Sequence, residues 1–151
     1  INQGATTMWE RWNSYSHEHG FGNAGMNSFN HYAYGAIGQW MYERVAGLVP
    51  DPYHPGYKHF FIQPILQSPL DHATAELNTP YGIAKSAWEK NDNGYIIKAT
   101  VPPNTTATLI LSKTEINKPT VTIQGNKLKL HFEDGKYRSL IKPGSYIFEI
   151  E

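Results

Sequence analysis

Short stretches of alternating apolar and polar residues fill the chain after residue 57. Leu128, Leu130 and Phe132 alternate with Lys129 and His131, as expected for a sheet with one face on a core and one in water. Turn sequences rich in Asn, Asp and Gly separate many of these stretches, and no helical pattern lies between them. The pattern predicts an antiparallel β-sandwich. The predicted strands are 60–62, 73–79, 83–89, 95–101, 105–111, 120–123, 128–132, 137–141 and 146–149.

The earlier part of the chain contains one predicted helix, from about Ser28 to Gly47. Asn27 or Ser28 can cap its start, and Gly47 followed by Pro50 can end it. Apolar side chains recur at helical spacing on one face, but the opposite face also lacks a solvated charge pattern. A helix with two uncharged faces belongs between other elements, so we expect that its packing partners lie outside this chain. The apolar face comprises Phe29, Ala33, Ala36, Ile37, Trp40 and Met41, and the opposite face His31, Tyr34, Gly35, Gly38, Tyr42 and Val45.

The composition changes near residue 56. Residues 1–56 hold three of the four Trp and eight of the 13 Gly, but only six of the 26 charged residues, which suggests buried surface around a pocket. Residues 57–151 carry the remaining charges, as a self-sufficient domain would. The join at residues 50–56 has the Pro and Gly content of a connector. The sequence therefore predicts an α+β chain with an incomplete helical part at 1–56 and a β-sandwich domain at 57–151.

The overall composition excludes several classes of function. Thirteen basic and thirteen acidic residues give a net charge of zero, so the basic excess of a nucleic-acid-binding protein is missing. The absence of cysteine excludes disulfides, thiolate metal sites and thiol nucleophiles. No apolar run approaches the roughly 20 residues that span a bilayer. Because the first residues are neither an initiator Met nor a signal peptide, we expect the chain to begin inside a longer protein.

Glu10 is the carboxylate with the most distinctive neighbours, because Trp9 and Trp12 flank it. Large aromatic faces stack on the C–H surfaces of sugar rings, and glycoside hydrolysis is carried out by pairs of carboxylates. In inverting enzymes the two carboxylates lie roughly 6.5–9.5 Å apart with a water between them. The residues alone leave a plainer interpretation open, in which Glu10 pairs with Arg11 or with another neighbour at the start of a helix.

His31 lies among amide and phenol side chains, which suit a ligand that bears many hydroxyl groups. The alternative is a core histidine with satisfied hydrogen bonds, and the residues alone favour it. His17 and His19 flank Glu18, but they lack a third partner for a metal ion, so we interpret this segment as a polar loop. The glycine-rich segment 20–25 matches a dinucleotide-binding pattern by letters only, because a polar stretch precedes it and the following strands look antiparallel.

Segments 4–12 and 27–38 together resemble the C-terminal end of the bacterial α-L-rhamnosidases of glycoside hydrolase family seventy-eight. Shorter matches follow, and the similarity is dense through residue 112. The combination is specific, although no single short motif is. The matching segments are Gly-Ala-Thr-Thr-Met-Trp-Glu-Arg-Trp at 4–12, Asn-Ser-Phe-Asn-His-Tyr-Ala-Tyr-Gly-Ala-Ile-Gly at 27–38, Ala-Gly-Leu at 46–48, Asp-Pro at 51–52, Pro-Gly-Tyr-Lys-His-Phe at 55–60, Pro-Tyr-Gly at 80–82 and Val-Pro-Pro-Asn-Thr-Thr-Ala at 101–107.

The resemblance implies that residues 1–56 close an (α/α)6 barrel and that the rest forms its C-terminal β-sandwich. It implies an inverting enzyme that removes terminal α-L-rhamnose from glycans or glycosides, without a metal or organic cofactor. Glu10 then looks like the general base that activates water, and His31 like a ligand of sugar hydroxyls, with Trp9 and Trp12 as further substrate-binding residues. The family's general acid lies upstream, so we expect this chain alone to be inactive and the remainder of the barrel to be its partner.

The competing interpretation is a stand-alone carbohydrate-binding or structural β-sandwich with a helical extension. A lectin would expose aromatic residues on its sandwich, whereas residues 57–151 keep only Trp88 and scattered Tyr and Phe. We expect the sandwich core to absorb these side chains. The uncovered face of the helix, with Tyr34, Tyr42 or Val45 exposed, favours self-association of the chain.

Overall fold

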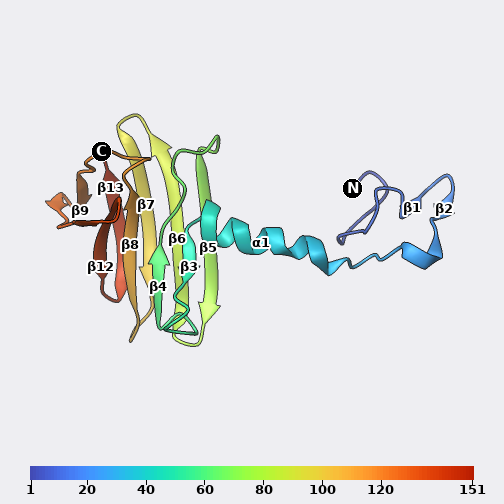
Figure 1. Cartoon of the computed structure of the whole chain (residues 1–151), viewed down its shortest axis with the longest axis horizontal. Helices are drawn as coiled ribbons and strands as arrows, with labels where there is room; N and C mark the ends of the chain where they lie inside the picture. Colours follow the sequence, from blue (N-terminus) through green and yellow to red (C-terminus); the bar gives the residue numbers. More distant parts are fainter. The chain divides into compact units, whose positions relative to one another are not determined.

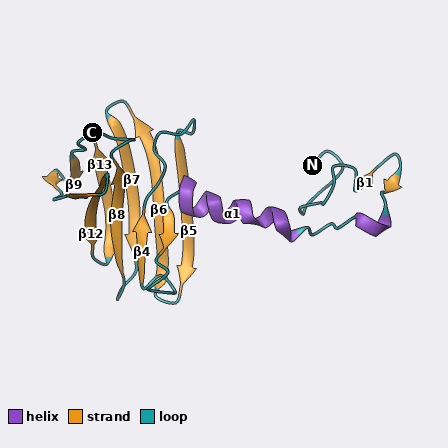
Figure 2. Cartoon of the chain, in the orientation of Figure 1, coloured by secondary structure: helices purple, strands orange, loops and turns teal.

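The computed structural model describes residues 1–151 and divides into two compact units, Ile1–Gln39 and Trp40–Glu151. Strands dominate the larger unit, and helical segments are few (Figure 2). None of the helices is long and apolar enough to cross a lipid bilayer. The strands of the larger unit are β3 (Leu48–Pro50), β4 (His59–Ile62), β5 (His72–Thr79), β6 (Gly82–Asn91), β7 (Gly94–Val101), β8 (Thr106–Ser112), β9 (Val121–Ile123), β10 (Asn126–Lys127), β11 (His131–Glu133), β12 (Lys136–Ile141) and β13 (Gly144–Ile150).

The strands of the larger unit form two sheets that face each other (Figure 1). One sheet has the order β10-β9-β13-β7-β6-β5, and the other has the order β11-β12-β8-β4-β3. The predicted antiparallel sandwich is confirmed, with one exception: β4 and β8 run parallel. Strands β5, β6 and β7 lie between them in the sequence and belong to the other sheet, so the chain makes the long crossover that parallel pairing requires.

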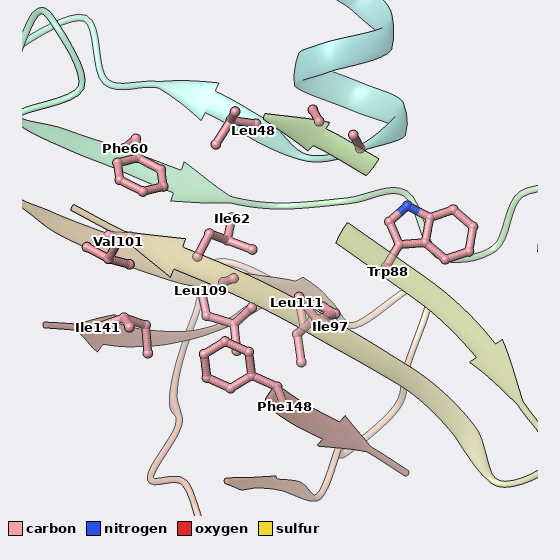
Figure 3. Packing of buried hydrophobic residues seen from close by; sticks show 14 of the residues in the cluster. Leu48, Phe60, Ile62, Trp88, Ile97, Val101, Leu109, Leu111, Ile141 and Phe148 are labelled. Atoms are coloured by element: carbon pink, nitrogen blue, oxygen red, sulfur yellow. The ribbon is translucent and has the colours of Figure 1, made fainter. Parts of the chain in front are cut away.

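Alternate side chains of both sheets meet in the core between them (Figure 3). The largest fully buried side chains include Phe60, Phe148 and Trp88, and Trp88 is only 2% exposed. The expectation that the core absorbs the aromatic side chains of residues 57–151 is confirmed for these three residues, but Tyr81 and Phe132 are exposed. Leu128 and Leu130 also pack against this core. The predicted strand at 128–132 is not continuous, because residues 128–130 form no strand and only the short strands β10 and β11 flank them.

Phe132 departs from the predicted alternation, because its side chain is 47% exposed. The residue lies on β11, the edge strand of its sheet, where no further strand covers it. Its ring lies 4.7 Å from the ring of Tyr137, and the ammonium of Lys113 sits 5.6 Å above it. A cross-strand aromatic pair capped by a cation replaces the predicted core contact.

The Pro- and Gly-rich segment at residues 50–56 begins with the last residue of β3 and continues into the loop before β4, which pairs antiparallel with β3. Asp51 stabilises this loop: its carboxylate accepts the backbone N–H of Tyr53 at 2.9 Å and lies 2.7 Å from Nδ1 of His54. These two contacts hold the pKa of the Asp51 carboxyl below its ordinary value. The division of the chain at residues 56 and 57 stays a prediction.

The predicted helix is present but shorter at both ends. A continuous helical run covers a 3-10 turn at Tyr32–Gly35, the α-helix α1 at Ala36–Trp40 and a π-helix at Met41–Val45. Ser28 does not cap it, because the backbone of Ser28 pairs with Glu10 instead. No residue of the run is buried. Most of its side chains are exposed, whereas Gly38, Glu43 and Val45 are half-buried.

The smaller unit has little regular structure besides the start of this run. Strands β1 (Tyr15–Ser16) and β2 (Gly20–Phe21) form a two-stranded hairpin, and a 3-10 turn follows at Ala24–Met26. Edge-to-face aromatic contacts link the hairpin to Phe29, whose ring lies 5.7 Å from the ring of Phe21. This aromatic cluster supports the two segments that carry the candidate site.

Candidate functional site

The residues around Glu10 lie alongside the residues around His31. The backbone N–H of Glu10 donates to the carbonyl of Ser28 at 2.8 Å, and the N–H of His31 donates to the carbonyl of Met8 at 2.8 Å. These bonds form although 21 positions separate Glu10 and His31 in the sequence. The structure thus brings two of the predicted site residues onto neighbouring, hydrogen-bonded segments.

The carboxylate of Glu10 is half-buried and is fixed through one oxygen. Its Oε2 accepts the backbone N–H of Ser28 at 2.8 Å, which leaves Oε1 free to accept a hydrogen bond or a proton from water. Glu10 lies outside any helix and forms no ion pair with Arg11. The pairing with Arg11 at the start of a helix is therefore absent, and the neighbour that Glu10 does pair with is the backbone of Ser28. The catalytic role of Glu10 stays a prediction.

An open hollow of about 870 Å³ lies beside Glu10. Its volume falls within the roughly 300–1,000 Å³ typical of small-molecule pockets. Trp9, Trp12 and Tyr34 contribute to its lining, and Glu10 is the only carboxylate in the lining. His31 does not line the hollow itself, but its ring lies 5.2 Å from the ring of Tyr34, which does.

The two tryptophans next to Glu10 differ in their surroundings. Trp9 is half-buried, and its ring packs edge-on against Phe29 at 5.2 Å and Tyr15 at 6.4 Å, so its orientation is fixed. Trp12 is fully exposed. The face of Trp12 is therefore available for stacking on a ligand, whereas Trp9 shapes the wall that carries Glu10.

Neither unit contains a group of three His, Asp or Glu side chains arranged to hold a metal ion. In the segment of residues 17–19, Nδ1 of His19 lies 3.6 Å from a carboxylate oxygen of Glu18, and both side chains are exposed. The segment lies in the turn between β1 and β2, in agreement with its interpretation as a polar loop.

Two contacts of Glu10 were not predicted from the sequence. Its carboxylate partner is a backbone N–H, that of Ser28, and a backbone donor leaves no side-chain signal in a sequence. The hydroxyl of Tyr34 donates to the carbonyl of Glu10 at 3.3 Å. The sequence does point to Tyr34 as a candidate site residue, because it is one of several aromatic residues grouped around His31.

Two protein-family models match adjacent parts of this chain. Residues 1–45 match the bacterial alpha-L-rhamnosidase 6 hairpin glycosidase domain, and residues 47–126 match the bacterial alpha-L-rhamnosidase C-terminal domain. The chain belongs to the bacterial α-L-rhamnosidase family. The resemblance of its sequence segments to this family is thereby confirmed.

Curated members of the α-L-rhamnosidase family are similar along the chain. An α-L-rhamnosidase of Formosa agariphila is 48% identical over 99% of this chain, and one of an Alteromonas species is 47% identical over 73% of it. The chain spans only 16% and 12% of the length of these two relatives. It therefore corresponds to a small portion of each α-L-rhamnosidase.

Solved α-L-rhamnosidase structures share the fold. The Streptomyces avermitilis α-L-rhamnosidase complexed with L-rhamnose has a TM-score of 0.74 and 36% identity, covering 98% of this chain and 14% of that one. The α-L-rhamnosidase from Dictyoglumus thermophilum has a TM-score of 0.79 and 29% identity, covering all of this chain and 17% of that one. The predicted fold class is confirmed by these similarities.

Proposed function

We propose that this chain is the C-terminal portion of an inverting glycoside hydrolase that releases terminal α-L-rhamnose from glycans or glycosides. Its curated relatives are α-L-rhamnosidases, and one similar structure is a complex with L-rhamnose. The observation that carries the proposal is the environment of Glu10, a half-buried carboxylate with one fixed and one free oxygen beside an aromatic-lined hollow.

In this proposal Glu10 is the general base. Its free Oε1 takes a proton from a water molecule while the water oxygen attacks the anomeric carbon of rhamnose. The glycosidic bond breaks on the opposite face of the sugar, and a general acid protonates the leaving oxygen. The bond from the N–H of Ser28 to Oε2 keeps the carboxylate oriented during this step.

The general acid must come from outside the hollow described above, because Glu10 is the only carboxylate that lines it. We therefore propose that the chain alone is inactive and that the remainder of the (α/α)6 barrel is its partner. In this arrangement residues 1–56 close the barrel and residues 57–151 form the β-sandwich. The exposed side chains of Ile37 and Trp40 would be covered by that partner, and in its absence they favour self-association.

A stand-alone carbohydrate-binding sandwich is the competing function. Sugar-binding modules use exposed aromatic faces, but Trp88 is the one tryptophan of the sandwich and is buried in its core. Its indole ring cannot stack on a sugar from this position. The exposed rings of Phe132 and Tyr81 each have a lysine ammonium over one face. We therefore retain the hydrolase as the proposed function.

His31→Ala in the full-length protein is expected to weaken catalysis far more than stability. If His31 binds a rhamnose hydroxyl, the lost hydrogen bond costs about 0.5–1.5 kcal/mol, and up to about 3 kcal/mol if a buried partner is left unsatisfied. At about 1.4 kcal/mol per factor of ten, kcat/KM for an aryl α-L-rhamnoside should fall between a few-fold and roughly a hundredfold. Steady-state kinetics and thermal unfolding of the same preparation measure both effects.

The matched control is His19→Ala, which removes an exposed histidine of the same unit that does not contact the hollow. This variant should retain both the kinetics and the melting temperature of the wild type. A melting temperature that drops by several degrees in His31→Ala, with unchanged kcat/KM, would instead identify His31 as a structural histidine.

A further inference from the structure

The smaller unit, Ile1–Gln39, is built around one buried polar residue. Ser14 is 1% exposed, and it is the only residue of this unit that is buried. It ends the turn of residues 11–14, which directly follows Glu10 in the sequence. The most protected point of the unit is therefore a hydrogen-bonding side chain beside the candidate base, and not an apolar one.

The backbone and the side chain of Ser14 are fully engaged in hydrogen bonds. Its N–H donates to the carbonyl of Arg11 at 3.2 Å, and its hydroxyl oxygen accepts the backbone N–H of Arg11 at 3.2 Å. Its carbonyl accepts two donors, the backbone N–H of Gly22 at 2.8 Å and the side-chain amide of Asn27 at 2.9 Å. A buried polar group that loses its partner is costly, so these bonds hold the turn in place.

The side chain of Asn27 is held by its donor group alone. Its Nδ2 donates to the carbonyl of Ser14, whereas its Oδ1 is buried and has no hydrogen-bond partner. An apolar side chain would avoid this unpaired oxygen, so the bond to Ser14 is the contact that an asparagine adds at this position. The next residue, Ser28, is the one whose backbone N–H binds Oε2 of Glu10.

These contacts form a closed ring that includes Glu10. Glu10 and Ser28 are joined by two bonds of 2.8 Å, from the N–H of Ser28 to the carboxylate and from the N–H of Glu10 to the carbonyl of Ser28. Asn27 precedes Ser28 and binds Ser14, and Ser14 binds Arg11, which follows Glu10. A shift of Asn27 or of the turn would therefore also shift the donor that orients the carboxylate.

We propose that Ser14 and Asn27, here called the clasp, are positioning residues for the general base. The clasp keeps the backbone N–H of Ser28 at Oε2 of Glu10 and so fixes the orientation of the free Oε1. Neither clasp residue lines the hollow beside Glu10, so both act through the carboxylate and not on the sugar. This role rests on the proposed function of Glu10 as the base that activates water.

The experiment measures Ser14→Ala and Asn27→Ala in the full-length protein, with kcat expressed per mole of folded enzyme. The base acts in the transition state and not in substrate binding, so a misplaced carboxylate lowers kcat and leaves KM almost unchanged. For an aryl α-L-rhamnoside we expect kcat to fall by roughly three- to thirtyfold, with KM within about twofold of the wild type. If one clasp variant fails to fold, the other carries the comparison.

The matched controls are Ser16→Ala and Asn23→Ala, which make the same two substitutions elsewhere in the smaller unit. The hydroxyl of Ser16 accepts the backbone N–H of His19 at 2.9 Å, and Oδ1 of Asn23 accepts the backbone N–H of Gly25 at 2.8 Å. Neither residue lines the hollow. Each control thus removes one bond between a side chain and the backbone, and each should keep the kcat and KM of the wild type.

A double-mutant cycle with Glu10→Gln separates positioning of the base from a structural role. Where no base is present, its orientation no longer matters. In the Glu10→Gln background, Ser14→Ala and Asn27→Ala should therefore lower the remaining kcat by less than about twofold, because residues that act through one another are not additive. A structural role would lower kcat by the same factor in both backgrounds.

The outcomes distinguish the positioning role from the proposed function. Clasp variants with the kcat of the wild type would overturn the positioning role alone, and so would equal losses of kcat with and without Glu10. A loss of the same size in Ser16→Ala and Asn23→Ala would also overturn it, because the effect would then follow from any lost bond in the unit. A full-length wild type that does not hydrolyse α-L-rhamnosides would overturn the proposed function, and the positioning role with it.

Discussion

Glu10→Gln in the full-length protein is expected to lower kcat for an aryl α-L-rhamnoside by at least on the order of 10²-fold, the low end of general-base contributions. Glutamine has nearly the same size, and its amide oxygen can still accept the N–H of Ser28, so the local structure should persist. The amide lacks the basicity to take a proton from water. The loss should therefore appear in kcat, with the melting temperature close to that of the wild type.

The matched control for this variant is Glu18→Gln. Glu18 belongs to the same unit and is exposed, and it does not line the hollow beside Glu10. Its replacement removes the same charge and should leave kcat unchanged. Near-normal kcat in Glu10→Gln would remove Glu10 from the catalytic role, whereas a loss of equal size in both variants would point to the net charge of the unit.

Gly47→Ala is expected to lower the stability of the larger unit strongly, because Gly47 lies in a tightly packed position between the helical run and β3. Gly47 has a φ of +76°, and a Cβ at this position would lie 2.1 Å from the backbone nitrogen of Pro64. The left-handed backbone costs an alanine about 1–2 kcal/mol, and the backbone displacement adds typically 1–3 kcal/mol. The free energy of unfolding of the larger unit should therefore fall by about 2–5 kcal/mol.

Gly125→Ala separates the two contributions to this loss. Gly125 has almost the same φ, +77°, but a Cβ there would have no atom within 4 Å. This control should show the backbone cost alone, about 1–2 kcal/mol. Urea unfolding of the 151-residue chain, followed by circular dichroism, measures both variants. Equal losses in Gly47→Ala and Gly125→Ala would show that the close approach of Pro64 does not contribute.

Most strands after residue 57 could be predicted because each carries its own alternation and turn, whereas the predicted strand at 128–132 is interrupted at residues 128–130. Strand β3 at Leu48–Pro50 was not predicted, since it is short, ends in proline and directly precedes a segment with the composition of a connector. Its strand character depends on pairing with β4, a tertiary contact without a local pattern. The parallel pairing of β4 with β8 was hidden from the sequence for the same reason.

The candidate site shows a similar division between local and long-range information. Glu10 and His31 could be selected because unusual neighbours surround each of them in the sequence. The pairing of their two segments could not be predicted, because backbone groups of Met8 and Ser28 make it. Burial of Trp88 followed from composition, but its bond to the carbonyl of Val45 depends on where the helix ends in space.

The anomeric form of the first rhamnose released tests the role of Glu10 most directly. If Glu10 activates a water that attacks the anomeric carbon in one displacement, an aryl α-L-rhamnoside must first give β-L-rhamnose. Proton NMR of the full-length protein, recorded before the product mutarotates, distinguishes the two anomers, and the 151-residue chain alone should release neither. We predict that the β anomer accumulates first. Early accumulation of the α anomer would show retention through a covalent intermediate and would contradict the assignment of Glu10 as a water-activating base.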